Sequence, residues 1–321
     1  MVKMRDILVL AVLACALIQP GCITVNLLEP PGPVQEVQLS GSGDGKILLM
    51  DLSGVISSSE KEGLIPGPNM LASFKEELTK ASKDDKVKAL VLRINSPGGT
   101  VNASDILYHE LKAFKANKKI PVIASMMDVA ASGGYYLAMA TDAILVHPST
   151  VTGSIGVIML TVNARGLLEK VGVEASAITS GPRKDMGSPF RTMTPEEKAI
   201  FQSVIDSFYQ RFLTVVQEGR PQLSADEIKK LADGRIYSGD QAKAAGLVDD
   251  IGYLEEAIDR AKKNAGLTEA RVVTYRRSGE YQNNIYSRVL GGGSGLNSLA
   301  HMDLLTMVRG GSPQFMYLWM P

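Results

Sequence analysis

A serine lies between small residues at the predicted junction of a strand and a helix. Ser132 follows the apolar run 120–126, which has the pattern of a buried parallel strand, and precedes 135–141, which has the pattern of a helix start. A sharp turn of this kind can hold a hydroxyl outward as a nucleophile, and the two glycines after the serine let another backbone approach closely. The same pattern fits an ordinary strand-to-helix turn with Ser132 as the helix N-cap. This segment alone leaves both interpretations open.

A serine hydroxyl needs a base to become nucleophilic, and the sequence offers two kinds. Of three histidines, only His147, which precedes a proline at a predicted strand end, lies near Ser132 in sequence; a lone histidine without a partner is commonly structural. Lysine is the base in Ser–Lys enzymes when its amine is neutral. Lys184 differs from the lysines on charged helical faces because it lies in a Gly/Pro loop between a predicted strand, 173–179, and a capped helix. The loop equally fits a solvated cation.

Acyl transfer also needs N–H donors directed at the developing oxyanion. Gly98 and Gly99 follow a predicted strand and carry no side chain that would cover their amides, while Gly133 directly follows the serine. Pro97 has no N–H and fixes the approach of the chain. Two glycine-rich strand ends, one of which carries a serine, together indicate an acyl-transfer site.

Composition excludes several other classes of protein. The 34 Lys and Arg residues balance the 34 Asp and Glu residues, so no bulk charge favours nucleic acid or another acidic partner. Both cysteines lie near the amino terminus, and no histidines are paired at helical ligand spacing. We therefore expect no metal and no cofactor, and a hydrolase built on this chain would work without them.

The two ends of the chain differ in character from its body. Residues 1–22 contain a basic start, a short apolar run and Gly21-Cys22, which is typical of a signal sequence or signal-anchor. Gly21-Cys22 is similar to the end of a bacterial lipobox, in which Cys22 would carry lipid, although Gln19 replaces the usual aliphatic residue. Residues 23–45 predict a flexible linker and residues 278–321 a flexible carboxyl-terminal tail. The body is expected at the membrane on the exported side, periplasmic or extracytoplasmic.

Residues 46–277 predict a single α/β domain. Buried strands are expected at 46–52, 87–94, 120–126 and 143–146, and amphipathic helices at 69–82 and 104–115. This alternation favours a parallel sheet covered by helices on both faces. Capping boxes that begin at Thr194 and Ser224 predict two further helices. No internal repeat is found, so the domain is expected to be one catalytic unit.

Four ordered motifs carry a resemblance to a known family. They are Asn95-Ser96-Pro97-Gly98-Gly99, Ala130-Ala131-Ser132-Gly133-Gly134-Tyr135-Tyr136, Thr152-Gly153-Ser154-Ile155-Gly156 and Ser180-Gly181-Pro182-Arg183-Lys184-Asp185, and the later segments 232–237 and 246–249 fit the same pattern. Over residues 46–266 the chain resembles the short, single-unit members of the bacterial signal peptide peptidase A (protease IV) family. The resemblance implies the Clp-protease and crotonase-like fold: a parallel sheet spiral with flanking helices in one catalytic domain.

The resemblance also implies roles for particular residues. Ser132 would be the nucleophile, Lys184 its general base and Ser154 the residue that orients the lysine amine, while Gly99 and Gly133 would donate to the oxyanion. It implies a homo-oligomeric ring, an octamer, in which the serine of one subunit meets the lysine of its neighbour. The activity implied is that of a membrane-associated serine endopeptidase that degrades remnant signal peptides, with loose selectivity for small and apolar residues.

Two other functions are compatible with this fold. An acyl-CoA enzyme of the same fold would use paired glycines but no Ser–Lys pair, and a non-catalytic membrane scaffold would need neither.

The tail ends in an apolar segment, 313–320, that glycines at 291–295 join to the body. We expect this segment to dock in a substrate groove and to be trimmed there; a membrane-facing or disordered tail is the alternative.

Overall fold

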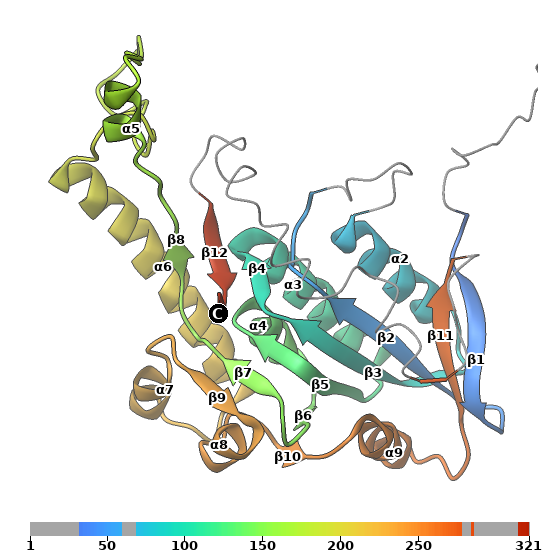
Figure 1. Cartoon of the computed structure of the whole chain (residues 1–321). Helices are drawn as coiled ribbons and strands as arrows, with labels where there is room; N and C mark the ends of the chain where they lie inside the picture. The colour runs from blue at the N-terminus through green and yellow to red at the C-terminus, as the bar shows by residue number, and fades with distance from the viewer. Residues whose placement is uncertain (1–31, 60–68, 278–283, 286–313, 321) are drawn as a thin grey trace, which may run out of the picture.

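The computed structural model describes residues 32–59, 69–277, 284–285 and 314–320, and these form a large twisted sheet with helices on both faces (Figure 1). The strands along the main path of the sheet run in the order β1 (Gln35–Gly41), β11 (Arg271–Arg276), β2 (Lys46–Ser53), β3 (Val87–Ser96), β5 (Val122–Ala131), β6 (Ala143–Val146) and β10 (Asp250–Ile251). Neighbours from β11 to β10 are parallel, and β1 pairs antiparallel at the edge. This is the predicted Clp-protease-like α/β architecture.

The strand paired with β5 changes along its length, from β6 to β7 (Val151–Gly153). β5 pairs with β6 as far as Met126 and then, from Val129, with β7. The Thr150 hydroxyl donates to the carbonyl of Met127 at 2.6 Å and so bridges the change of partner. β9 (Ile236–Ser238) extends this part of the sheet antiparallel to β7.

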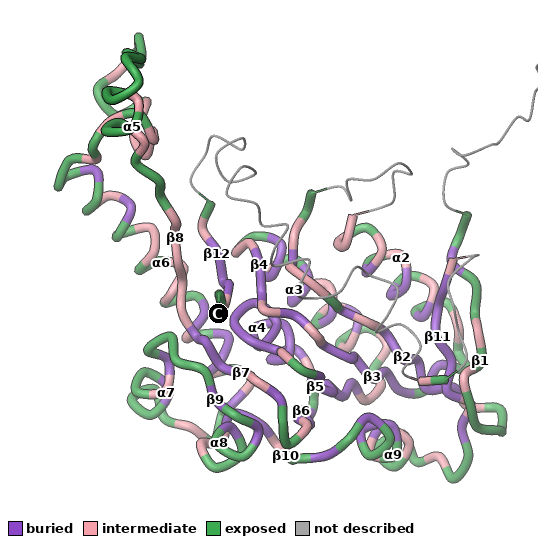
Figure 2. The backbone as a smooth tube through the Cα atoms, viewed as in Figure 1, coloured by how far each residue is buried: buried purple, intermediate pink, exposed green. Residues whose placement is uncertain are grey.

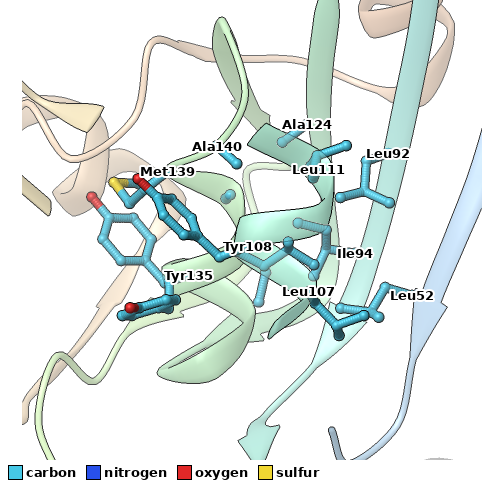
Figure 3. Packing of buried hydrophobic residues seen from close by; sticks show 14 of the residues in the cluster. Leu52, Leu92, Ile94, Leu107, Tyr108, Leu111, Ala124, Tyr135, Met139 and Ala140 are labelled. Carbon is cyan, nitrogen blue, oxygen red and sulfur yellow. The ribbon is translucent and has the colours of Figure 1, made fainter. Parts of the chain in front are cut away.

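Side chains of the central strands point alternately to the two faces of the sheet, and each face packs in its own hydrophobic core. In β2, Ile47 and Leu49 face one core while Leu48, Met50 and Leu52 face the other. Helix α9 (Leu254–Asn264) covers the first face, and the second is covered by α2 (Met70–Ser82), α3 (Val101–Lys118) and α4 (Gly133–Ala138). Leu107 and Leu111 of α3 lie with Leu92 and Ile94 of β3 in this second core (Figure 3).

The remaining helices lie beyond the β7 end of the sheet. They are α5 (Arg165–Lys170), α6 (Pro195–Gly219), α7 (Ala225–Leu231) and α8 (Gly239–Ala244). Both predicted capping boxes are present, at Thr194 and Ser224. Residues 160–194 form an arm that projects from the body with α5 near its tip, and α6 runs from this arm back to α4 (Figure 1).

A second, three-stranded sheet lies above α4. Its strands are β4 (Gly98–Thr100), β12 (Phe315–Leu318) and β8 (Ile158–Met159), with β12 in the middle and antiparallel to both neighbours. β12 comes from the carboxyl-terminal segment, which therefore forms an ordered strand at 315–318 (Figure 1).

Two local expectations were wrong. Residues 35–41, assigned to the linker, form β1, because Val37 and Leu39 alternate with polar residues and Leu39 packs on the α9 core. Residues 173–179, expected as a strand before Lys184, form none and are exposed, since no neighbouring strand pairs with them in the described part of the chain. The signal sequence and Cys22 lie outside the described residues. Within the described ranges, no helix is both long and apolar enough to span a membrane.

Candidate active site

Ser132 lies at the sharp turn from β5 into α4. Its backbone φ of 53° and ψ of −114° is a conformation that residues with a side chain rarely adopt. The turn is fixed by its N–H, which donates to the Gly153 carbonyl at 2.7 Å, and by its carbonyl, which accepts from the Tyr136 N–H at 2.8 Å. The serine occupies the N-cap position, yet its side chain makes no capping bond.

The Ser132 hydroxyl is buried and unpaired among the described residues. The residue is 1% exposed, and its Oγ has no hydrogen-bond partner within the described part of the chain. Unpaired buried polar atoms on a strained backbone are uncommon and mark functional sites. The N-cap alternative for Ser132 therefore leaves its side chain unexplained, whereas a nucleophile would use this hydroxyl with a base that the described part of the same chain does not place beside it.

The glycine turn after β3 lies against the Ser132 turn. A Cβ added to Gly98 would come within 2.7 Å of the Gly133 N, and one added to Gly133 within 3.2 Å of the Gly98 Cα. Gly98 has a φ of 100°, and its N–H is held by the Ser96 hydroxyl at 3.1 Å. Gly99 lies one residue further on, where a Cβ would meet the Ile56 carbonyl at 1.9 Å. All three predicted glycines thus border one site, and Gly98 is the one in direct contact with Gly133.

Ser154 lies beside Ser132 at the end of the neighbouring strand. Ala131 of β5 is opposite Gly153 of β7, and the two strands are parallel. Ser132 and Ser154 are the next residues after the two strands, so they are neighbours as well. Ser154 also has a positive φ, 49°, and its N–H donates to the Arg235 carbonyl at 2.8 Å. The structure therefore brings together Ser132, Ser154, Gly99 and Gly133.

Lys184 is not brought to Ser132 within one chain. It is an exposed residue in the turn region 180–187. This region belongs to the projecting arm, much of which is exposed (Figures 1 and 2). Its backbone N–H donates to the Gly181 carbonyl at 3.2 Å. A base at this position could reach a serine only in another copy of the chain or after a large movement of the arm.

His147 is held away from the Ser132 turn by its packing. Its ring lies 5.1 Å from that of Tyr253, at the start of α9 on the opposite face of the sheet from α4. Burial lowers the pKa of His147, so the ring is neutral at neutral pH. These contacts agree with a structural role for this histidine.

A peptide strand passes directly over the glycine turn, and it belongs to the chain itself. In β12, Tyr317 is opposite Gly99 and Leu318 is opposite Gly98, while the Trp319 N–H donates to the Pro97 carbonyl at 2.8 Å. The Tyr317 carbonyl oxygen lies 3.1 Å from a Cβ built on Gly133 and 2.0 Å from one built on Gly98. The Tyr317–Leu318 peptide is therefore the part of β12 that faces the Ser132 turn.

The side chain of Tyr317 fills an aromatic pocket next to this turn. It is fully buried, with ring centroids 5.1 Å from Tyr136 of α4 and 4.7 Å from Phe212 of α6. Its hydroxyl donates to the Phe208 carbonyl at 2.8 Å. Phe315, two residues earlier, lies on the same side of the strand, 5.3 Å from the Phe208 ring.

Two hollows continue the groove on either side of β12. One, of about 540 Å³, is lined by Ser154, the segment 155–158, part of α6 and Leu318 to Met320. The other, of about 420 Å³, lies beside Phe315 and Tyr317 and includes Asp105 and Arg211. Substrate residues on both sides of the facing peptide bond would find space here.

Several residues of this site were not predicted from the sequence. Ser96 holds Gly98, and Phe208 and Phe212 of α6 line the aromatic pocket. The 4-residue and 7-residue spacings of Phe201, Phe208 and Phe212 do indicate one aromatic helix face. Nothing in the sequence says that this face meets a strand from residues 315–318.

A buried, unpaired serine hydroxyl at a strand-to-helix turn, beside a glycine turn and a strand-binding groove, is the arrangement expected of a serine hydrolase. Comparison with known proteins agrees. Residues 114–268 match the model of peptidase family S49, and residues 68–152 match that of Clp protease.

Similar proteins occur in several organisms. A candidate signal peptide peptidase SppA of Enterococcus faecium is 40% identical over 243 residues, covering 75% of this chain and 70% of the relative. A candidate protease of Synechocystis is 39% identical over 255 residues, covering 79% and 86%. Protease 4 of Salmonella typhi is 36% identical over 232 residues, covering 72% of this chain and 37% of the relative. The chain belongs to peptidase family S49 and is a serine protease, which confirms the resemblance and removes the acyl-CoA enzyme and the scaffold as alternatives.

Proposed function

We propose that this protein is a membrane-associated serine endopeptidase that degrades remnant signal peptides, with Ser132 as nucleophile and Lys184 as general base. The observation that carries the proposal is the strand β12, which lies between β4 and β8 with its Tyr317 carbonyl against Gly98 and Gly133. A peptide bound in this way presents a carbonyl carbon to the Ser132 hydroxyl and its oxygen to glycine amides.

The chemical steps follow from this placement. The neutral Lys184 amine takes the proton of the Ser132 hydroxyl as its Oγ attacks the carbonyl carbon, and the amides of Gly99 and Gly133 stabilise the oxyanion. The resulting ammonium then protonates the leaving amine, which leaves an acyl-enzyme that water hydrolyses. Ser154 would accept a hydrogen bond from the lysine and so orient it.

The dyad is assembled between copies of the chain in this proposal. The arm that carries Lys184 exposes Leu167, Val171, Ile178 and Phe190, each more than half exposed. Such a group of apolar side chains on a projection favours a partner surface. A heterologous contact repeated from subunit to subunit closes into a ring, in agreement with the homo-oligomer expected from the sequence. A signal-anchor or lipidated Cys22 would hold this ring at the membrane, with its active sites on the exported side.

Membrane-embedded peptides test the substrate class. A synthetic signal peptide in lipid vesicles is incubated with the wild-type protein and with the Ser132→Ala variant, and fragments are identified by mass spectrometry. Fragments that appear only with the wild type support the proposal. A wild-type enzyme that cleaves casein but leaves the vesicle-bound peptide intact would contradict the substrate class and leave the protease assignment in place.

We further propose that the carboxyl-terminal segment occupies the groove as a competing ligand and is cleaved between Tyr317 and Leu318. Removal of residues 314–321 is expected to lower the KM for an added peptide several-fold, because the added peptide no longer competes with a tethered one. Intact-mass measurement of the wild type is expected to show loss of residues 318–321 that the Ser132→Ala variant does not show. Identical masses for the two proteins would contradict cleavage, and an unchanged KM would contradict occupancy.

The pocket around Tyr317 predicts the residue preferred before the cleaved bond. Matched fluorogenic peptides with Tyr, Phe or Ala at this position are expected to differ in kcat/KM. Tyr should exceed Phe by about three- to tenfold, because only Tyr donates to the Phe208 carbonyl. Ala should be cleaved about a hundredfold more slowly, because it leaves an aromatic pocket unfilled. A preference for Ala would contradict this assignment and support the sequence-based expectation of small residues.

A further inference from the structure

The turn that carries Lys184 is joined to α6 by a single guanidinium. Arg191 donates from Nε and Nη2 to the two carboxylate oxygens of Asp185, at 2.7 and 2.8 Å. The same group donates from Nη1 and Nη2 to the two oxygens of Glu197, at 2.8 and 2.5 Å. Arg191 therefore binds two carboxylates with paired bonds to each, which is the arrangement that fixes geometry best.

One of these carboxylates is rigid and the other is adjacent to the proposed base. Glu197 is buried at the third position of α6, where it accepts from the Thr194 N–H at 3.0 Å as part of the capping box. Asp185 directly follows Lys184 in a turn whose other hydrogen bonds among the described residues are local, such as Met186 N–H to the Arg183 carbonyl. Arg191 is thus the side chain that transmits the fixed position of α6 to the lysine turn.

Helix α6 connects the lysine turn to the body of the enzyme. It has 25 residues and, at 1.5 Å per residue, spans about 37 Å from the arm to the core. In its second half Phe212 is fully buried, with its ring 5.0 Å from that of Tyr136 in α4, one turn after Ser132. The same helix supplies Phe208 and Phe212 to the aromatic pocket. The lysine turn is therefore attached to the first turn of a helix whose middle and second half line the substrate groove.

We propose that Arg191 is a positioning residue for the reaction: by clamping Asp185 to Glu197 it sets where the Lys184 amine is presented by the arm. The inference rests on the proposed function, since it assumes that Lys184 is the base. The clamp also neutralises part of the acidic charge next to the lysine. Arg191 pairing lowers the pKa of Asp185 and lowers that of Glu197 to about 2, so both carboxylates remain ionised and the clamp persists throughout the neutral range.

Steady-state kinetics of Arg191→Ala test this role. The expected result is a kcat roughly 10- to 100-fold lower with an unchanged KM, because the groove formed by β4 and β8 does not contact Arg191 whereas the lysine is displaced. Arg191→Lys, which retains the charge without the paired geometry, should recover only part of the loss. Arg260→Ala is the matched control: Arg260 pairs with Asp250 far from the arm, and its loss should leave kcat unchanged.

Asp185→Asn separates geometry from charge. It breaks the clamp at the turn while leaving Glu197 and the start of α6 intact, and by removing an acidic group beside the lysine it would, through charge alone, favour the neutral amine. A lowered kcat in Asp185→Asn therefore supports positioning. A kcat equal to or above that of the wild type would overturn it.

Mixed assemblies distinguish positioning from a general structural defect. If Arg191 acts through the lysine, Arg191→Ala subunits should regain activity when mixed with Ser132→Ala subunits, which supply an intact arm, and should gain nothing from Lys184→Ala subunits. Wild-type kcat in a folded, assembled Arg191→Ala variant would overturn the inference while leaving the dyad in place. Full activity of Lys184→Ala would instead overturn the proposed function.

Discussion

Ser132→Ala and Lys184→Ala are each expected to lower kcat/KM by about 10⁴-fold or more, because removing either member of a nucleophile–base pair removes the same step. Mixing the two inactive variants is expected to restore activity. In a ring with one dyad per subunit contact, random assembly pairs an intact serine with an intact lysine at about a quarter of the sites. Peptide hydrolysis by the separate and the co-refolded variants measures both effects.

The controls for this experiment are assembly size and folding. Sedimentation should show the same oligomer for the wild type, for each variant and for the mixture, and circular dichroism should show the same helix content. If the mixture assembles normally but shows no peptide hydrolysis, the dyad must form within one chain, which would require the arm to move. Retention of activity in either single variant would remove that residue from the mechanism.

Gly98→Ala is expected to reduce activity by at least about 10²-fold, because the methyl group would lie where the substrate carbonyl and an oxyanion donor meet. The added Cβ would be 2.0 Å from the Tyr317 carbonyl oxygen and 2.7 Å from the Gly133 N. The φ of 100° adds backbone strain of about 1–3 kcal/mol. Peptide hydrolysis and chemical denaturation of the variant measure the two consequences separately.

Gly266→Ala is the matched control for this change. Gly266 also has a positive φ, 68°, but a Cβ there would meet no atom within 4 Å, and the residue follows α9 on the other face of the sheet. It should lose stability without losing kcat/KM. Equal losses of activity in the two variants would show that strain alone explains Gly98→Ala and that the glycine turn does not face the substrate.

The features that the sequence predicted are those that depend on local pattern. The central strands follow from apolar runs such as 87–94, and the Ser132 turn follows from small residues between a strand and a helix. The fold and the family are confirmed. The catalytic roles of Ser132, Lys184, Ser154, Gly99 and Gly133 remain predictions, although four of these five residues lie together in one chain.

The features that the sequence did not predict depend on contacts between distant segments. The pairing of β12 with β4 joins residue 317 to residue 99, and no local pattern specifies that register. The pairing of Arg191 with Asp185 and Glu197 was not predicted. Each acidic residue is six positions from the arginine, and this spacing matches neither a helix nor a strand. The position of Lys184 depends on an arm that projects from its own domain, and the contact that we propose for it lies in another copy of the chain, which no local pattern describes.

The middle position of β12 has a consequence for the form in which a substrate must arrive. β4 and β8 each pair with β12, so a ligand that replaces it must offer hydrogen-bonding groups along both of its edges at once. A strand inside a folded sheet already uses both edges, and a helix uses its groups internally. If substrates bind in the place of β12, as we propose, natively folded proteins should be spared unless a segment detaches, and susceptibility should follow the local unfolding free energy of the target more closely than its sequence.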